Sequence, residues 1–264
     1  MRKEPDGKRR PLAVVTGASS GIGEEIARVL AAKGCDLRLV ARREDRLRTL
    51  AKELSSQFGV DVVFDVVDLA DSAALDVWIA AVREARRPPA WLINNAGFGA
   101  HEATLKVPSG RFREMARLNI EAVLMTSRLI GEDMAAEGSG RIVNVASTAA
   151  FQAVPWFGVY AATKAFVLHF SEALAVELRG RVGVTALCPG QTKTEFVGSA
   201  NMDGRFDRMP AMTARAVAEI GIAAAEKGKI VCVPGNLNRL QTFLSMKLPR
   251  SFIRTCSTKL FRRP

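Results

Sequence analysis

The chain has 264 residues, a hydrophobic fraction of 48% and a formal net charge of +11. This length and composition allow a substantial buried core in a globular protein. The four cysteines form no C-x-x-C pair and no long apolar run occurs, which argues against a zinc site, a disulfide framework, a signal peptide and a membrane span. We therefore expect a cytoplasmic protein without a bound metal.

The first motif follows an apolar run at 12–15, which is typical of a buried strand. Gly17, Gly21 and Gly23 come directly after it and open a helix predicted over 24–33. Glycines let the backbone approach a phosphate closely, and a helix N-terminus supplies free N–H groups and positive potential. The sequence therefore predicts a nucleotide site at this turn, with the spacing G-x-x-x-G-x-G.

The end of the second predicted strand indicates which nucleotide is bound. An acid there would accept a hydrogen bond from a ribose hydroxyl and favour NAD(H). Ala41 stands at that position and Arg42 follows it. Because a guanidinium can bind a 2′-phosphate, helped by the hydroxyls of the glycine loop, we expect NADP(H) in preference to NAD(H).

Strand and helix signals continue to alternate along the chain, with short joints. This pattern predicts right-handed β-α-β units and a mainly parallel sheet. We expect one doubly wound (Rossmann) α/β domain over 11–235, with seven strands and helices on both faces, between a basic segment 1–10 and an extension 236–264. The strands are predicted over 12–15, 37–40, 60–66, 91–93, 141–146, 183–187 and 230–233, and the helices over 24–33, 43–54, 73–85, 112–134, 158–178 and 213–227.

Tyr160, the chain's one tyrosine, precedes Lys164 by four residues within a predicted helix. Side chains at i and i+4 share one helix face, so the phenol would lie beside the ammonium. A cation about 5 Å away, at an effective dielectric constant of about 20, is worth about 3 kcal/mol, or roughly two pKa units. The pair therefore indicates a tyrosine adapted to acid–base chemistry, although a surface Tyr and Lys would give the same spacing.

Several short motifs together resemble the classical short-chain dehydrogenase/reductase family. These are TGASSGIG at 16–23, NNAG at 94–97, Asn119, Ser147, the Tyr160–Lys164 pair and Pro189-Gly190, in the family's order and spacing over about 11–235. Each motif is weak alone, but their combination is specific.

The resemblance implies a carbonyl–alcohol oxidoreductase with four catalytic residues. Tyr160 would exchange the proton, and Lys164 would lower the Tyr160 pKa and hold ribose hydroxyls. Ser147 would hydrogen-bond the carbonyl oxygen, and Asn119 would position a water that links Lys164 to solvent. The hydride belongs to the cofactor. By position, the cofactor would contact Gly17, Ser19, Ser20, Gly21, Ile22, Gly23, Arg42, Asp68, Leu69, Asn95, Ala96, Gly97, Tyr160, Lys164, Pro189, Gly190, Thr192 and Thr194.

Apolar side chains in two segments suggest an apolar substrate. One segment is 151–157, and the other, 195–212, has no clear period and is predicted as a mobile loop or short helices that carry Phe196, Met202, Phe206 and Met209. His101 could reach the pocket mouth or be an ordinary loop residue. His169 is expected to be an ordinary helix residue.

The extension 236–264 carries apolar residues at helical spacing among basic ones, and no acid follows Lys229. It could lie on a membrane, cover the substrate, pack on its own domain or pack on a sister subunit. The resemblance implies a homodimer or homotetramer formed through the helices that hold Asn119 and Tyr160. The basic ends could also indicate nucleic acid, but no aromatic–basic platform supports that. The alternative function is a non-catalytic nucleotide sensor on the same fold.

Overall fold

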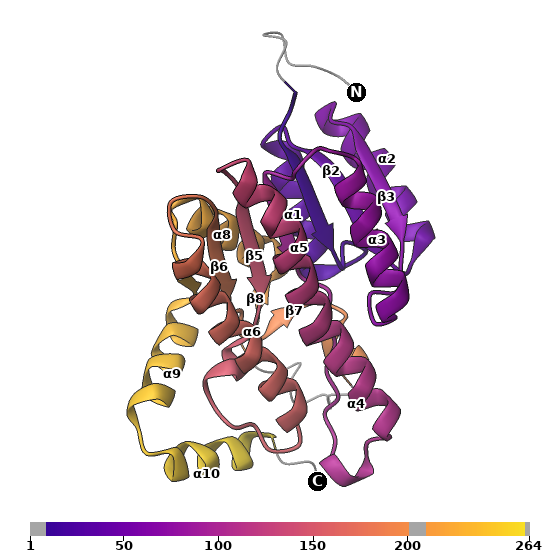
Figure 1. Cartoon of the computed structure of the whole chain (residues 1–264). Coiled ribbons are helices and arrows are strands. Elements are labelled where there is room, and N and C mark those ends of the chain that lie inside the picture. Colours follow the sequence, from indigo (N-terminus) through magenta and orange to yellow (C-terminus); the bar gives the residue numbers. More distant parts are fainter. Residues whose placement is uncertain (1–8, 201–209, 262–264) are drawn as a thin grey trace.

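The structure is a computed structural model, which describes residues 9–200 and 210–261 (Figure 1). Its main sheet contains seven parallel strands in the order β3-β2-β1-β4-β5-β6-β9, which confirms the predicted doubly wound α/β fold. All seven predicted strands are present. They are β1 (Leu12–Thr16), β2 (Asp36–Ala41), β3 (Val62–Val66), β4 (Trp91–Asn94), β5 (Arg141–Val145), β6 (Gly183–Leu187) and β9 (Val231–Cys232).

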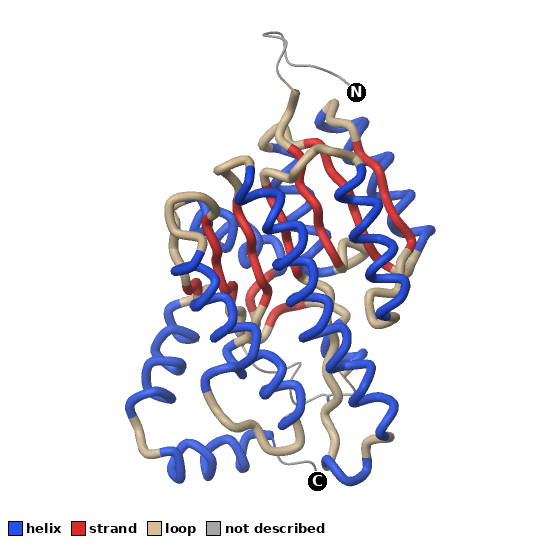
Figure 2. Tube along the Cα trace, in the orientation of Figure 1, coloured by secondary structure: helices blue, strands red, loops and turns tan. Residues whose placement is uncertain are grey.

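Helices cover both faces of the sheet (Figure 2). On one face, α1 (Gly21–Ala32), α2 (Glu44–Phe58) and α8 (Ala214–Glu226) pack over a core that includes Ala13 and Val15 of β1. On the other face, α3 (Ser72–Glu84), α5 (Ala122–Ala136) and α6 (Gly158–Glu177) pack over a second core that includes Val14. Neighbouring residues of β1 thus point to opposite faces, as the strand period of two requires.

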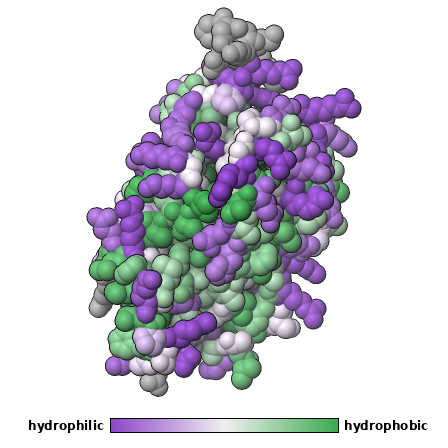
Figure 3. All heavy atoms as spheres, turned by 60° about the vertical axis from the view of Figure 1, so that its left-hand side comes forward, coloured by the Kyte–Doolittle hydropathy of each residue, from purple (hydrophilic) through white to green (hydrophobic). Residues whose placement is uncertain are grey.

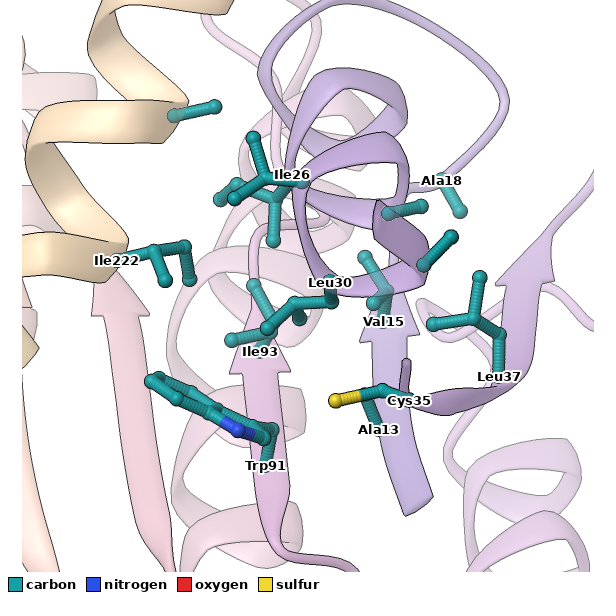
Figure 4. Close-up of a cluster of buried hydrophobic side chains, with 14 of the residues drawn as sticks. Ala13, Val15, Ala18, Ile26, Leu30, Cys35, Leu37, Trp91, Ile93 and Ile222 are labelled. Atoms are coloured by element: carbon teal, nitrogen blue, oxygen red, sulfur yellow. The ribbon is translucent and has the colours of Figure 1, made fainter. Parts of the chain in front are cut away.

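The first of these cores is assembled from segments far apart in the sequence. Figure 4 shows Ile26 and Leu30 of α1 lying beside Ile93 of β4, with Ile222 of α8 on the far side. These four side chains are fully buried. Because burial of one such side chain contributes about 1.5–3 kcal/mol, α1 is firmly held against the sheet. Its N-terminus, which carries the glycine loop, is thereby fixed in place.

The strand order reverses between β1 and β4, because β1 pairs with β2 on one side and with β4 on the other. Loops that leave neighbouring strands in opposite directions open a crevice at their carboxyl ends. Thr16 at the end of β1 bridges this point. Its Oγ1 donates to the carbonyl oxygen of Ile93 (3.2 Å) and accepts from the backbone N–H groups of Asn95 (3.0 Å) and Ala96 (3.1 Å).

The predicted helix over 112–134 is wrong in one respect, because it is not a regular α-helix throughout. A five-residue π-helical turn, η2 (Arg117–Glu121), separates α4 (Ser109–Ala116) from α5. Such turns insert one extra residue and are frequent at functional sites. Asn119 lies inside this turn and is fully buried.

Short elements complete the described chain. Thr192–Lys193 (β7) pairs with Met212–Thr213 (β8), and α7 (Phe196–Ser199) lies in the segment predicted as a loop or short helices. Two 3-10 turns, η1 (Thr104–Lys106) and η3 (Thr148–Phe151), precede α4 and α6. The extension forms α9 (Asn236–Lys247) and α10 (Arg250–Phe261), at the end of the molecule opposite the start of β1 (Figure 1). Among the described residues, no helix is long and apolar enough to cross a bilayer.

Candidate active site

A cavity of about 540 Å³ lies at the carboxyl ends of the strands. It falls within the range usual for binding small molecules. Most of the residues that the sequence assigns to the cofactor and to catalysis line it. They are Gly17, Ser19, Ser20, Gly21, Ile22, Arg42, Asp68, Leu69, Asn95, Ala96, Gly97, Ser147, Tyr160, Lys164, Pro189, Gly190, Thr192 and Thr194. Gly23 and Asn119 are not part of the lining, and both lie just behind it.

Tyr160 and Lys164 lie one turn apart on α6 and are both buried. The Lys164 Nζ lies 5.8 Å from the centre of the Tyr160 ring and donates a hydrogen bond to the Val145 carbonyl oxygen (2.7 Å) at the end of β5. The Tyr160 ring stacks on Phe157, with 4.3 Å between ring centres, and contacts Phe196 at 5.4 Å. The phenol is therefore held in one orientation between apolar rings.

Burial controls the protonation of this pair. It raises the pKa of Tyr160 to about 12, while a hydrogen bond with Ser147 acts in the opposite direction. Burial also lowers the pKa of Lys164 from 10.5 to about 8. The family resemblance implies that Lys164 lowers the Tyr160 pKa, but in the chain alone burial has the larger effect and raises it, because loss of hydration disfavours the phenolate and the ammonium alike. At neutral pH the phenol keeps its proton.

Ser147 is placed by the end of β5. It caps η3, where its Oγ accepts a hydrogen bond from the Ala149 N–H (3.1 Å). The same hydroxyl interacts with Tyr160 and lines the cavity. A hydroxyl fixed by backbone in this way can donate its own proton to an oxygen in the cavity without reorganising.

Asn119 acts on the site through its neighbours. Its Oδ1 accepts from the Phe98 N–H (3.1 Å), and its Nδ2 donates to the Phe98 carbonyl oxygen (2.9 Å) and to Thr163 Oγ1 (3.0 Å). It therefore fastens the segment after β4 to α6, the helix of Tyr160. The π-turn η2 brings this side chain under Gly97, where an added Cβ would lie 2.9 Å from Asn119 Oδ1 and 3.4 Å from Lys164 Nζ.

The glycine loop fits a dinucleotide phosphate. Gly17 and Gly21 have φ angles of +65° and +60°, which favour glycine. Ser20 precedes α1 without capping it through its side chain, so the first-turn N–H groups are left for a ligand. Gly23 serves packing instead, because a Cβ there would lie 2.4 Å from the Gly17 carbonyl oxygen and from Asn95 Nδ2.

Two arginines that follow β2 lie beside this loop. Arg42 is largely exposed, and its ion pairs with described residues are loose, with Asp68 (3.8 Å) and Glu114 (3.6 Å). Arg43 was not singled out from the sequence, yet it lines the cavity and donates from Nε to Ser19 Oγ (3.1 Å). Glu195 binds Arg43 at 2.8 Å across the cavity edge. The Arg-Arg pair in the sequence was the only signal for this second guanidinium.

The other end of the cavity is apolar, as the sequence predicts. Val154 and Phe157 of the segment 151–157 line it together with Phe196, whereas Gln152 is its polar member. Met202, Phe206 and Met209 lie outside the described residues. Helices α9 and α10 complete the lining, so the extension lies along the cavity, which is one of the positions that the sequence left open. They contribute Leu237, Asn238, Gln241, Leu260 and Phe261.

The two histidines lie outside the cavity lining. His101 is a fully buried loop residue, and its Nε2 lies 2.9 Å from the Phe261 carbonyl oxygen at the end of α10. Its ring meets Phe157 edge-on, with 6.0 Å between ring centres. His169 is exposed on α6 beside Glu172. His101 therefore connects the extension to the ring that stacks on Tyr160.

A doubly wound sheet with a cavity at its switch point defines a dinucleotide-binding class of fold, and comparison with known proteins gives the family. A family model described as short chain dehydrogenase matches residues 11–204. The chain is 39% identical over 194 residues to the granaticin polyketide synthase putative ketoacyl reductase 1 of Streptomyces violaceoruber, covering 72% of this chain and 71% of that protein. The chain therefore belongs to the short-chain dehydrogenase family of oxidoreductases.

Solved structures agree with this assignment. A short-chain dehydrogenase from Sphingobium yanoikuyae in complex with NADPH superposes with a TM-score of 0.81 at 30% identity, covering 90% of this chain and 96% of that chain. A short-chain dehydrogenase/reductase from Burkholderia phymatum in complex with NAD shares the fold, with a TM-score of 0.81 at 24% identity and coverage of 97% and 96%. Members with this fold thus bind NAD or NADP(H).

Proposed function

We propose that the chain is an NADP(H)-dependent oxidoreductase that interconverts a carbonyl and an alcohol on an apolar substrate. The observation that carries this proposal is the meeting of Tyr160, Ser147 and Lys164 in one cavity with the glycine loop. A proton donor, an oxygen-binding hydroxyl and a buried cation then surround the place where a nicotinamide and a carbonyl would meet. The first relative, a putative ketoacyl reductase, is consistent with such chemistry.

The residues divide the work of reduction among them. The cofactor, when bound, supplies the hydride. Tyr160 gives its phenolic proton to the substrate oxygen as that oxygen gains negative charge, and Ser147 donates a hydrogen bond to the same atom. Lys164 has two donors beyond the bond to Val145 and would hold ribose hydroxyls. Asn119 holds the segment after β4 against α6 through its hydrogen bonds to Phe98 and Thr163, and it is a positioning residue.

The raised pKa of Tyr160, about 12, supports its role as the proton donor in the reducing direction. A phenol that is protonated across the physiological range is ready to act as an acid. Oxidation would instead require Tyr160 to accept a proton, and burial makes its phenolate costly.

Turnover of a carbonyl panel tests the proposal. We expect the chain to oxidise NADPH with apolar ketones, aldehydes or ketoacyl thioesters, and poorly with sugars. Tyr160→Phe should lower kcat by a factor of about 10²–10⁴, because only the proton donor is removed. Its NADPH dissociation constant, measured by fluorescence titration, should match that of the wild type. Binding of NADPH without turnover of any carbonyl would instead favour the nucleotide sensor.

Preference for NADP(H) rests on Ala41, which offers no carboxylate to a ribose hydroxyl, and on the two guanidiniums beside it. We expect Arg42→Ala to lower kcat/KM with NADPH by about tenfold or more, since it removes one charge-assisted contact to the 2′-phosphate. Its kcat/KM with NADH should stay within twofold. The exposed Arg48→Ala on α2 is the matched control. An unchanged ratio of the two efficiencies in Arg42→Ala would contradict the preference.

Association into a dimer or tetramer through the helices of Asn119 and Tyr160 remains a prediction from the family. It does not enter the chemistry above, because the residues named for the reaction all come from a single chain.

A further inference from the structure

Helices α9 and α10 bury few of their own residues against the rest of the chain. Each has twelve residues but buries one, Thr242 in α9 and Ser257 in α10. Isolated helices of this length are marginal in water, so packing must normally stabilise them. Most of their apolar side chains are exposed instead, including Leu237 and Leu260, which lie where the helices border the cavity. Of the thirteen large apolar side chains that are exposed among the described residues, eight belong to this hairpin: Leu237, Leu240, Phe243, Leu244, Met246, Leu248, Phe252 and Leu260.

The charged residues of the hairpin all have one sign. No aspartate or glutamate occurs between 236 and 261, although the chain as a whole has 27 acidic residues. The five basic side chains are all exposed and none of them forms an ion pair with the described residues. They are Arg239, Lys247, Arg250, Arg254 and Lys259. The outer face therefore combines apolar surface with uncompensated positive charge.

The hairpin is nevertheless held in a defined place. Asn238 Nδ2 donates to the Pro234 carbonyl oxygen (2.7 Å), and Ser245 Oγ donates to Gln152 Oε1 (2.6 Å). At the far end, His101 contacts the Phe261 carbonyl oxygen. Hydrogen bonds at both ends thus fix the hairpin against the cavity and leave its outer face free to meet a partner.

We propose that the α9–α10 hairpin is a docking surface for an anionic lipid bilayer. The apolar side chains would enter the boundary between headgroups and acyl chains, while the basic side chains meet anionic headgroups. Figure 3 shows apolar surface gathered over the lower half of the face on which these helices lie, with hydrophilic residues dominating the upper half. The combination of the two features is typical of helices that lie in a membrane interface.

Charge argues against a second copy of the chain as the occupant. In a twofold-symmetric contact the same patch meets itself, so five basic side chains would face the same five with no carboxylate of the hairpin between them. Like charges brought together in this way oppose association. An anionic surface removes the repulsion and uses the apolar side chains as well.

Docking of the hairpin would bring the cavity next to the surface of the bilayer. Leu237, Leu260 and Phe261 belong to the docking helices and also line the cavity. A substrate dissolved in the bilayer would then reach Tyr160 along these helices without crossing water. This consequence rests on the proposed function and names a class of substrate, a lipid-soluble carbonyl compound. The docking itself does not depend on catalysis.

Vesicle sedimentation of the full chain tests the docking. Wild-type protein is mixed with vesicles of phosphatidylcholine alone or with a third of phosphatidylglycerol, at low and high salt. The apolar variant carries Phe243→Gln, Met246→Gln and Phe252→Gln, and its control carries Val63→Gln, Val77→Gln and Leu105→Gln, which are exposed elsewhere. The charge variant carries Lys247→Gln, Arg250→Gln, Arg254→Gln and Lys259→Gln. Its control carries Lys52→Gln, Lys106→Gln, Arg181→Gln and Lys227→Gln.

We expect wild-type protein to bind the anionic vesicles and to dissociate at high salt, because salt screens surface charges. Each hairpin variant should bind at least tenfold more weakly than its control, with unchanged Tm and NADPH affinity. Wild-type protein that ignores anionic vesicles, or hairpin variants that bind like their controls, would overturn the proposal. So would hairpin variants that only lower the oligomeric mass in light scattering, because the face would then be an interface between copies.

Discussion

Lys164 is a buried ammonium that no carboxylate of the described chain neutralises. Its Nζ donates to the Val145 carbonyl oxygen, and burial lowers its pKa to about 8. In the folded protein the charge is therefore costly, and the cost is balanced only when something in the cavity uses it. A residue that weakens the fold in order to hold a ligand is a common feature of active sites.

The stability of Lys164→Met should reveal this cost. The fall in the Lys164 pKa from 10.5 to about 8 corresponds to a loss of about 3 kcal/mol in the free energy of unfolding. Below pH 8 the wild type bears the full cost, and between about pH 8 and 10.5 the unfolded chain binds more protons, so stability rises with pH. We expect Lys164→Met to raise the free energy of unfolding by up to about 3 kcal/mol at pH 7 and to weaken NADPH binding.

Urea unfolding at pH 7 and pH 10 is the measurement. The stability that Lys164→Met gains over the wild type should be smaller at the higher pH, because the wild-type ammonium loses its proton there. The exposed Lys52→Met is the control and should change stability by less than about 0.5 kcal/mol. A Lys164→Met protein less stable than the wild type at both pH values would show that the ammonium stabilises the fold.

At the level of elements, a buried polar network fixes the two helices of the site to the sheet. Asn94 of β4 donates to Asn144 Oδ1 of β5 (2.8 Å) and to Ser127 Oγ of α5 (3.0 Å), and it accepts from Thr126 Oγ1 (2.8 Å). Asn144 in turn donates to Ser171 Oγ of α6 (3.0 Å). Tyr160 lies on α6, and Asn119 lies in the π-turn that leads into α5, so the positions of both depend on one set of hydrogen bonds.

Asn94→Leu should remove the centre of that network at nearly constant volume. It removes one hydrogen bond each from Thr126, Ser127 and Asn144, although Thr126 Oγ1 still reaches the Ala122 carbonyl oxygen (2.6 Å) and Ser127 Oγ still reaches Asn144 Oδ1 (3.4 Å). Because each lost hydrogen bond costs about 0.5–1.5 kcal/mol net, we expect the free energy of unfolding to fall by about 2–4 kcal/mol, measured by urea unfolding. Gln57→Leu, on the exposed side of α2, should change it by less than about 0.5 kcal/mol. Equal stabilities of the two variants would show that the network contributes little.

The elements differ in how far the sequence predicts them. The seven strands of the sheet are short runs rich in apolar residues between turn signals, so their number and positions follow from residue pattern. The π-turn does not, because Met115, Leu118 and Ala122 continue the apolar spacing of an α-helix through it. The two-residue pair β7–β8 is too short for any period. Its pairing depends on contacts between distant segments.

At the scale of the whole molecule, the glycine loop and the Tyr160–Lys164 pair could be predicted because each is a local pattern. The apolar end of the cavity could be predicted only in part. Phe157 and Phe196 were expected there, but the contributions of Leu237 and Phe261 depend on how the extension folds back across the body. Apolar residues at helical spacing indicate that one face of a helix is apolar. They do not indicate which surface that face packs against.

The net charge of +11 is not spread evenly over the surface of the folded chain. Elsewhere many basic side chains are compensated, as Arg83 is by Asp133 and Arg38 by Asp65. Along the hairpin they are not. A uniform excess of charge would say little about function, whereas an excess confined to one apolar face identifies the part of the molecule to test.

The aromatic composition makes Tyr160 directly observable. A protein with a single tyrosine, labelled with ¹³C at the ring carbon that bears the oxygen, gives one resonance from its phenol. No assignment and no subtraction of other tyrosines are needed, and the signal comes from a residue that lines the cavity. The ionisation of the proposed proton donor can thus be followed in the intact chain. The binding of each ligand can be followed by the change in chemical shift of that one resonance.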